Sequence, residues 1–138
     1  MNILDFMDHP DLMGDTFQGE SWEAWRAILS GTFAIPMEPK RSRLFSSLAG
    51  GRTAPKSRAR ELWVVAGRRS AKTQTAGATA VYLATVGATI TGLANKLSPG
   101  ERGVIALLAV DRQQAKVALG YIRGMIENSP VLAGMVEK

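Results

Sequence analysis

The sequence has no cysteine and a single histidine, and these absences exclude several kinds of site. Without cysteine there is no disulfide framework and no thiolate metal site. The one histidine, His9, lies in a segment rich in Asp and Pro, which indicates a solvated residue rather than a ligand or catalytic base. The N-terminus is acidic and lacks a long apolar core, so no secretory signal is visible and we expect a cytoplasmic location.

Long uninterrupted apolar runs are also missing. The most apolar stretch, residues 76–97, contains Gly and Thr, which give it weak membrane hydropathy. We therefore expect a buried helix rather than a membrane span, and no membrane partner. The length of 138 residues suits one domain.

Charge is present but unevenly distributed along the chain. Residues 1–38 carry seven acids against one base, a net charge of −6, whereas residues 39–72 carry ten bases against one acid, a net charge of +9. A basic block of this kind predicts a polyanionic partner, either nucleic acid or nucleotide phosphate. The alternative is a solvated linker. Phe45 is the only aromatic residue within 40–60, so this block lacks the stacking residues of a protein that binds single strands.

Two short apolar runs, Leu62–Ala66 and Gly103–Val110, have the composition of buried parallel strands. Each is followed by a helical pattern, so the sequence predicts an α/β fold with parallel strands and right-handed crossover helices. Residues 61–138 would then form an incomplete P-loop ATPase core. Residues 1–60 would form an N-terminal arm with a Trp-containing helix and a basic connector, its first 20 residues poorly ordered or loosely docked.

The expected helices follow from apolar spacing and from capping and stop signals. Ser21 is the expected N-cap of the first, in which Trp22, Trp25, Ile28 and Leu29 share one face. The expected helical ranges are 21–29, 71–95 and 111–127, with one or two turns within 43–48 and a helical tail from residue 131.

The most informative stretch follows the first expected strand and reads Gly-Arg-Arg-Ser-Ala-Lys-Thr over residues 67–73. A strand, a phosphate-sized loop, Lys-Thr and a helix form the layout of a P-loop. In such a loop the backbone N–H groups and the helix dipole attract an anion. Lys72 can then reach the β- and γ-phosphates of ATP, and the Thr73 hydroxyl can ligate Mg²⁺. The predicted cofactor-binding residues are Gly67, Arg68, Arg69, Ser70, Ala71, Lys72 and Thr73.

The motif departs from the usual pattern of glycines. Ala66 and Ala71 stand where the two glycines would be, and a Cβ at the second position lies where the backbone must approach phosphate. The alternative interpretation is therefore an ordinary strand, turn and helix with an exposed basic turn.

Together these residues resemble the N-terminal part of the ATPase domain of tailed-phage terminase large subunits, the DNA-packaging motors. Residues 63–73 look like that family's relaxed Walker A motif, in which paired arginines are usual. Three further pieces resemble the upstream Trp-containing segment, the connector before the first strand, and the second strand with its helix: residues 17–26, 51–55 and 110–115. The resemblance extends from about residue 17 onward.

The resemblance implies roles for several residues. Lys72 and Arg68 would be catalytic, with Arg68 acting on the γ-phosphate as a cis arginine finger, and Thr73 would hold the metal. The alternative for Arg68 and Arg69 is generic attraction of phosphate or DNA. Three upstream residues could border the adenine: Gln18, Trp22 and Trp25. Core packing of an amphipathic helix is the favoured interpretation for them. Implied cofactors are ATP and Mg²⁺. Implied partners are double-stranded DNA, the terminase small subunit and the portal protein, in the host cytoplasm.

Part of such a motor is missing from the sequence. An apolar strand ending in Asp-Glu is needed for hydrolysis, and a nuclease needs clustered carboxylates. Residues 104–111 imitate the strand, but Arg112 stands where Glu should follow Asp111. The sequence thus resembles a truncated or split large subunit, and we expect no ATP turnover by these residues alone. Another P-loop ATPase or kinase fragment, or a non-catalytic DNA-binding module built on residues 40–60, are the alternatives.

Overall fold

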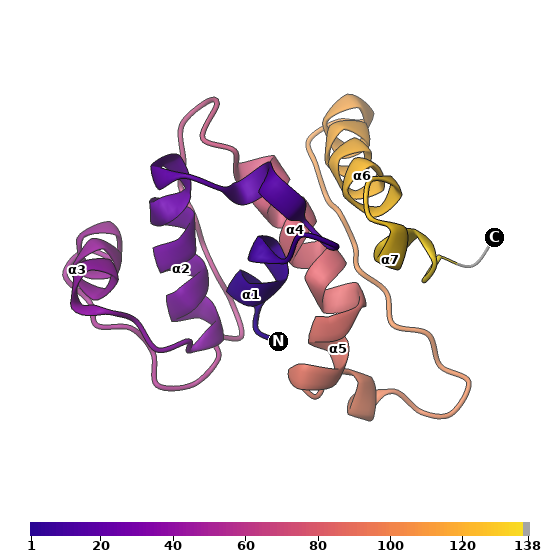
Figure 1. Ribbon diagram of the computed structural model, residues 1–138, viewed down its shortest axis with the longest axis horizontal. Helices are drawn as coiled ribbons and strands as arrows, with labels where there is room; N and C mark the ends of the chain where they lie inside the picture. Colours follow the sequence, from indigo (N-terminus) through magenta and orange to yellow (C-terminus); the bar gives the residue numbers. More distant parts are fainter. Residues whose placement is uncertain (137–138) are drawn as a thin grey trace. The chain divides into compact units, whose positions relative to one another are not determined.

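The structure is a computed structural model that describes residues 1–136 as helices joined by turns and extended segments (Figure 1). The chain divides into two compact units. Unit 1 comprises Met1–Gly14 and Gly67–Lys138, and unit 2 comprises Asp15–Ala66. No helix within residues 1–136 is both long and apolar enough to cross a membrane.

The predicted α/β fold with parallel strands is wrong, because residues 1–136 contain no β-strand. The two expected strands, Leu62–Ala66 and Gly103–Val110, are extended but unpaired. Several of their large side chains are exposed to solvent: Trp63 is 89% exposed and Leu108 is 95% exposed. A parallel strand needs a neighbour to complete its hydrogen bonds and a layer over each face. Neither segment has these partners in the described chain, so the apolar runs form no sheet.

Helix α4 (Lys72–Ala84) is the centre of unit 1, with α1 (Ile3–Asp8) and α6 (Arg112–Glu127) packed against it. Its inward residues are small or apolar, and they include Ala78, Val81 and Tyr82, all fully buried. At Gly77 a Cβ would lie 3.5 Å from side-chain atoms of Tyr121 and Ile122 on α6, an ordinary van der Waals contact, so α6 lies directly against this side of α4. Helices α4 and α6 thus pack directly against each other.

The first residues of the chain differ from the loosely docked arm that we expected. Asn2 caps α1 by accepting from the N–H groups of Leu4 and Asp5, and the Asp5 carboxylate accepts in return from the N–H of Asn2. This reciprocal capping box fixes the start of a helix that is only six residues long. Its apolar residues Ile3 and Phe6 are fully buried, so α1 belongs to the core of unit 1.

The long helix expected over 71–95 is interrupted at Thr85, where φ is −118° and ψ is −113°. The Thr85 hydroxyl donates to the carbonyl of Val81 at 2.7 Å, a local bond that competes with the helical ladder. The chain continues as α5 (Val86–Ile90) and η3 (Ala94–Lys96). One predicted helix is therefore three short ones.

The helix predicted over 111–127 is confirmed as α6. Asp111 is its N-cap and accepts from the N–H of Gln114 at 2.8 Å. Ser129 then caps α7 (Pro130–Ala133) and also donates to the carbonyl of Asp11 at 2.6 Å. This last bond ties the two ends of unit 1 together.

Unit 2 is built on α2 (Glu23–Phe33) and α3 (Pro39–Leu48), which pack against each other and are preceded by η1 (Gly14–Phe17) and η2 (Glu20–Trp22). Gly31 marks the closest approach of α2 and α3, because a Cβ there would overlap the ring of Phe45. The expected turns within 43–48 are confirmed and are part of the longer α3, which Pro39 starts.

The first predicted helix exists but begins and packs differently. The helix α2 starts at Glu23 rather than after Ser21, and its buried residues include Ala27, Leu29 and Ser30. Trp22 and Trp25, which we placed on the packing face with Leu29, are only half-buried. Which face of α2 is buried thus depends on the elements that pack against it, and the spacing of apolar residues alone does not predict those elements.

Candidate phosphate-binding loop and basic surface

The loop from Gly67 to Ala71 turns sharply before α4. Two of its residues, Arg69 and Ala71, have positive φ values of 61° and 58°. A residue with a side chain in this left-handed region costs about 1–2 kcal/mol, which is why Gly is usual there. Such local strain clusters at ligand-binding sites, and the alternation of backbone conformations forms concave nests of N–H groups.

Two side chains close this loop on a single carbonyl oxygen. The Nζ of Lys72 donates to the carbonyl of Gly67 at 3.1 Å, and the Ser70 hydroxyl donates to the same oxygen at 2.8 Å. Lys72 is exposed to solvent. The ammonium group therefore lies over the loop and is accessible to an anion from outside.

The N-terminus of α4 carries no side-chain cap. Its N-cap residue is Ala71, whose carbonyl accepts from the N–H of Thr75 at 2.9 Å. The N–H groups of Lys72 and Thr73 precede this bond and have no earlier helical turn to donate to. They carry the positive end of the helix dipole, which favours an anion.

The remaining predicted site residues surround this helix start. Arg68 and Arg69 are exposed and Thr73 is half-buried, with no hydrogen bond to its hydroxyl from any described residue. In residues 1–136 no group of three or more His, Cys, Asp or Glu side chains could hold a metal ion. A Mg²⁺ ion here would therefore depend on Thr73, on water and on the phosphates themselves.

Asp111, the one residue that could replace the missing acid, is already engaged. Its carboxylate caps α6 through Gln114, and Arg112 is the first residue of that helix. Asp111 thus serves as a helix cap, and the next residue, Arg112, supplies no second carboxylate.

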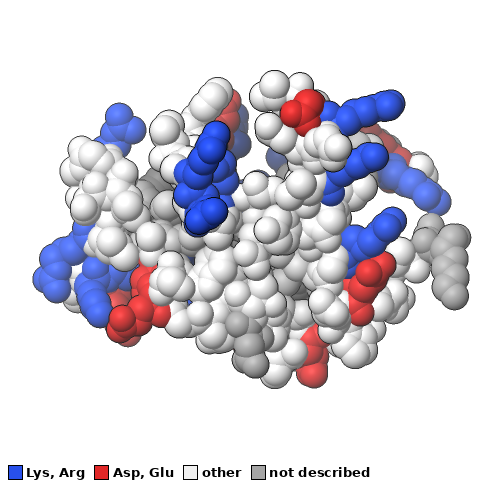
Figure 2. Space-filling model, turned by 90° about the horizontal axis from the view of Figure 1, so that it is seen from above, with Lys and Arg blue, Asp and Glu red and all other residues white. Residues whose placement is uncertain are grey.

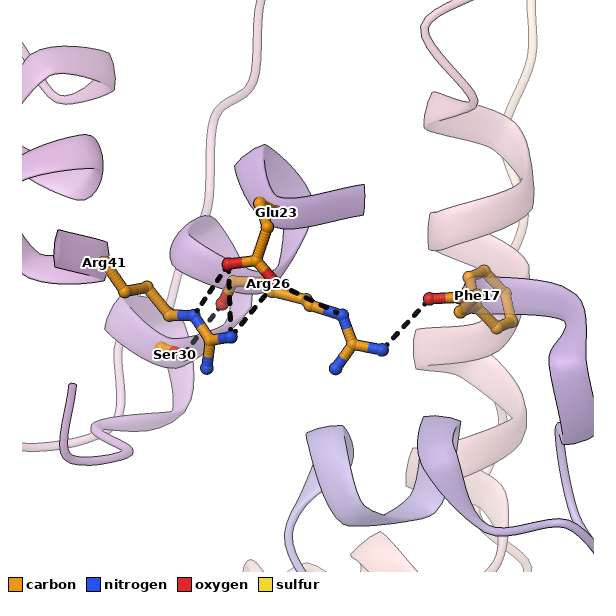
Figure 3. Close-up of polar contacts among 5 residues, drawn as sticks. All are labelled: Phe17, Glu23, Arg26, Ser30 and Arg41. Carbon is orange, nitrogen blue, oxygen red and sulfur yellow. Dashed lines mark hydrogen bonds and ion pairs between the residues drawn. The ribbon is translucent and has the colours of Figure 1, made fainter. Parts of the chain in front are cut away.

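Unit 2 contains an ion-pair network that the sequence did not indicate (Figure 3). Arg26 is 7% exposed, and its Nη2 donates to the carbonyl of Phe17 at 3.0 Å. Its Nε lies 3.9 Å from Oε1 of Glu23. Glu23 also accepts from Nε and Nη2 of Arg41, at 3.3 Å and 3.2 Å. The network joins α2, α3 and the segment before them, and its only sequence signal was the i,i+3 spacing of Glu23 and Arg26.

The network removes Arg41 from the cations that are free to bind a polyanion. The other cations of 40–60 remain exposed: Lys40, Arg43, Arg52, Lys56, Arg58 and Arg60. Figure 2 shows Lys and Arg side chains gathered over α3, with acidic side chains beside them. A pocket of about 270 Å³ beside the start of α3 is lined by acids and bases together: Glu20, Glu23, Glu38, Lys40, Arg41 and Leu44. This end of α3 is mixed in charge, whereas residues 52–60 are basic without an acid.

The proposed adenine neighbours all lie in unit 2. The ring of Trp22 packs edge-on against Phe17 at a centroid distance of 4.8 Å. Gln18 is exposed and Trp25 is half-buried. These positions agree with packing for Trp22, and contact with adenine stays a prediction.

Comparisons with known protein families, with curated proteins and with solved structures gave no match.

Proposed function

We propose that residues 67–73 bind the phosphates of ATP, and that the chain is the ATP-binding part of a tailed-phage DNA-packaging motor. The observation that carries the proposal is the loop itself. It has left-handed residues at Arg69 and Ala71, an uncapped helix start, and the Lys72 ammonium folded over the Gly67 carbonyl. The family assignment rests on the resemblance of the sequence.

In this proposal Lys72 exchanges one acceptor for a stronger one. Its Nζ leaves the uncharged carbonyl oxygen of Gly67 and donates to a negatively charged phosphate oxygen, so that both partners of the new bond are charged. Thr73 presents its free hydroxyl to Mg²⁺, and Arg68 approaches the γ-phosphate. Another P-loop ATPase or kinase would use the loop in the same way.

The macromolecular partners of the proposal are double-stranded DNA, the terminase small subunit and the portal protein, in the host cytoplasm. Support for DNA comes from unit 2, where residues 52–60 expose four cations: Arg52, Lys56, Arg58 and Arg60. Phosphate contacts by such residues bind DNA without sequence preference. The same exposure favours a second candidate function, a DNA-binding module without catalysis.

The test is a titration of the 138-residue chain with fluorescent ATP and Mg²⁺, comparing Lys72→Ala with the unsubstituted chain. Loss of a charged hydrogen bond of about 1.5–3 kcal/mol should weaken ATP binding about 10-fold to 100-fold. Lys96→Ala is the matched control, because Lys96 is also an exposed lysine of unit 1 but lies outside the loop. It should leave the affinity unchanged.

Equal ATP affinity of Lys72→Ala and Lys96→Ala would exclude the loop as the phosphate site. If the chain then still bound DNA in a salt-dependent way, the non-catalytic DNA-binding module would be the better function.

A further inference from the structure

A second surface of unit 1 is hollowed, at a distance along the chain from the loop of residues 67–73. A groove of about 520 Å³ lies between the extended segment 103–110 and α6. Figure 1 shows this segment running beside α6 before it enters the helix. The lining residues are Ile105, Leu107, Arg112, Ala115, Lys116 and Leu119.

The segment 103–110 has the alternation of a β-strand although it is unpaired. Ile105 and Leu107 line the groove, whereas Val104 and Leu108 are 87% and 95% exposed. Successive side chains of an extended chain point to opposite sides, so the odd-numbered residues face α6 and the even-numbered residues face away. The segment is therefore already in the conformation that a neighbouring strand would require.

The backbone of this segment has no partners of its own. Within residues 1–136 no hydrogen bond joins an N–H or C=O of residues 103–110 to another residue. Eight consecutive residues with free backbone groups form a template for an added strand. An extended peptide can pair with such an edge through main-chain bonds, and its alternate side chains then determine specificity.

The residues that line the groove indicate which side chains of a ligand would fit it. Arg112 and Lys116 are one turn apart on α6 and have no ion-pair partner among the described residues. Ile105, Leu107 and Leu119 make the rest of the lining apolar. Apolar side chains with a carboxylate at one end match this lining in both hydrophobicity and charge.

We propose that the groove binds an extended peptide segment of a partner protein, with alternating apolar residues and an acidic residue at one end. The peptide pairs with residues 103–110 as an added strand. Its inward side chains enter the groove, and its acidic end lies against Arg112 and Lys116. The unpaired backbone is the reason to prefer a peptide over a small anion, because a small anion would leave it unpaired.

The experiment uses the full chain and a labelled eight-residue peptide with blocked termini, valine at alternate positions and glutamate at one end. A second peptide has lysine in place of glutamate. Fluorescence polarisation should show that the acidic peptide binds more tightly. Lys116→Glu should weaken that binding about threefold to tenfold and should favour the lysine peptide. Lys96→Glu, the same change outside the groove, should have no effect on either peptide.

A matched pair of apolar substitutions tests which side of the segment is used. Ile105→Ser should weaken binding of the acidic peptide, whereas Leu108→Ser, on the side that faces away from α6, should not. Hydrogen exchange should slow at amides within 104–110 when the peptide is present. No binding of the acidic peptide, equal losses in the two serine variants, or binding without protection of 104–110 would each overturn the proposal.

Discussion

The ring of Phe6 meets the ring of Tyr82 edge to face, with the centroids 5.4 Å apart and the planes at 62°. Both side chains are almost fully buried, at 0% and 1% exposure. The contact joins α1 to α4, so a residue near the start of the chain packs against the helix that follows the Gly67–Ala71 loop. Edge-to-face pairs of this kind add stability beyond the area that they bury.

We therefore predict that Phe6→Ala lowers the free energy of unfolding by about 3–5 kcal/mol, because it leaves a cavity beneath α4. Thermal or urea unfolding followed by circular dichroism measures this. Tyr82→Phe keeps the ring and removes the hydroxyl that donates to the carbonyl of Met1 at a long 3.4 Å, so it should destabilise the protein much less than Phe6→Ala. Wild-type stability in Phe6→Ala would show that α1 is not part of the core.

A second prediction concerns the buried guanidinium of unit 2. Arg26→Met should destabilise the protein by about 1–3 kcal/mol, because the carbonyl of Phe17 loses its donor inside the unit. Arg43→Met is the control: this residue lies on α3 and is exposed, so the change should stay within about 0.5 kcal/mol. Urea unfolding of both variants makes the comparison, and equal effects would contradict a structural role for Arg26.

The third prediction is that the chain binds double-stranded DNA weakly, with an affinity that falls as salt rises through release of counterions. Replacing both Arg58 and Arg60 by Ala should lower the slope of log K against log salt by about 2, if each contacts one phosphate. Arg123→Ala, an exposed arginine of α6, serves as the control. If the affinity for DNA did not change with salt concentration, residues 40–60 would be a connector and not a DNA-binding segment.

The fourth prediction is that these 138 residues do not hydrolyse ATP. In-line attack needs an oriented water and a metal held from two sides, and Asp111 is occupied as a helix cap. Asp111→Asn keeps a capping oxygen, so both its melting temperature and its phosphate release should match those of the unsubstituted chain. Metal-dependent turnover that Asp111→Asn abolishes would show that Asp111 is catalytic.

Helices with strong local signals could be predicted from the sequence. Residues 111–127 carry a capping Asp111, apolar residues at helical spacing and a Pro130 stop, and α6 begins and ends within one residue of that prediction. The signals are local, so they hold whatever surrounds the helix. The loop from Gly67 to Ala71 was also predicted as a turn before a helix, because its residues are consecutive.

The strands could not be predicted, because a strand is defined by its partner. Leu62–Ala66 and Gly103–Val110 have strand composition, and they are extended, but no described segment pairs with them. An apolar run shows that a segment could be buried, but it does not show whether a second strand is present to pair with it. The Arg26 network was missed for the same reason, since Phe17 and Arg41 join it through tertiary packing.

The α1 helix was missed although its signal is in the sequence. Asn2 and Asp5 have the spacing of a capping box, and Ile3 and Phe6 have the spacing of one helical face. The nearby Pro10 and the many acids of this segment are typical of a loop, which is what we expected there. A short helix of this kind is stable only because α4 covers it.

Unit 1 is made of two stretches of chain separated by the whole of unit 2. During synthesis, Ile3, Phe6 and Met7 leave the ribosome long before Tyr82 exists to cover them. The chain must therefore carry an uncovered apolar helix face through the production of more than sixty further residues. Closing a loop of that length costs entropy before any contact repays it. Unit 2, whose contacts lie within one continuous stretch, can complete its fold first, while unit 1 has to wait for its second half.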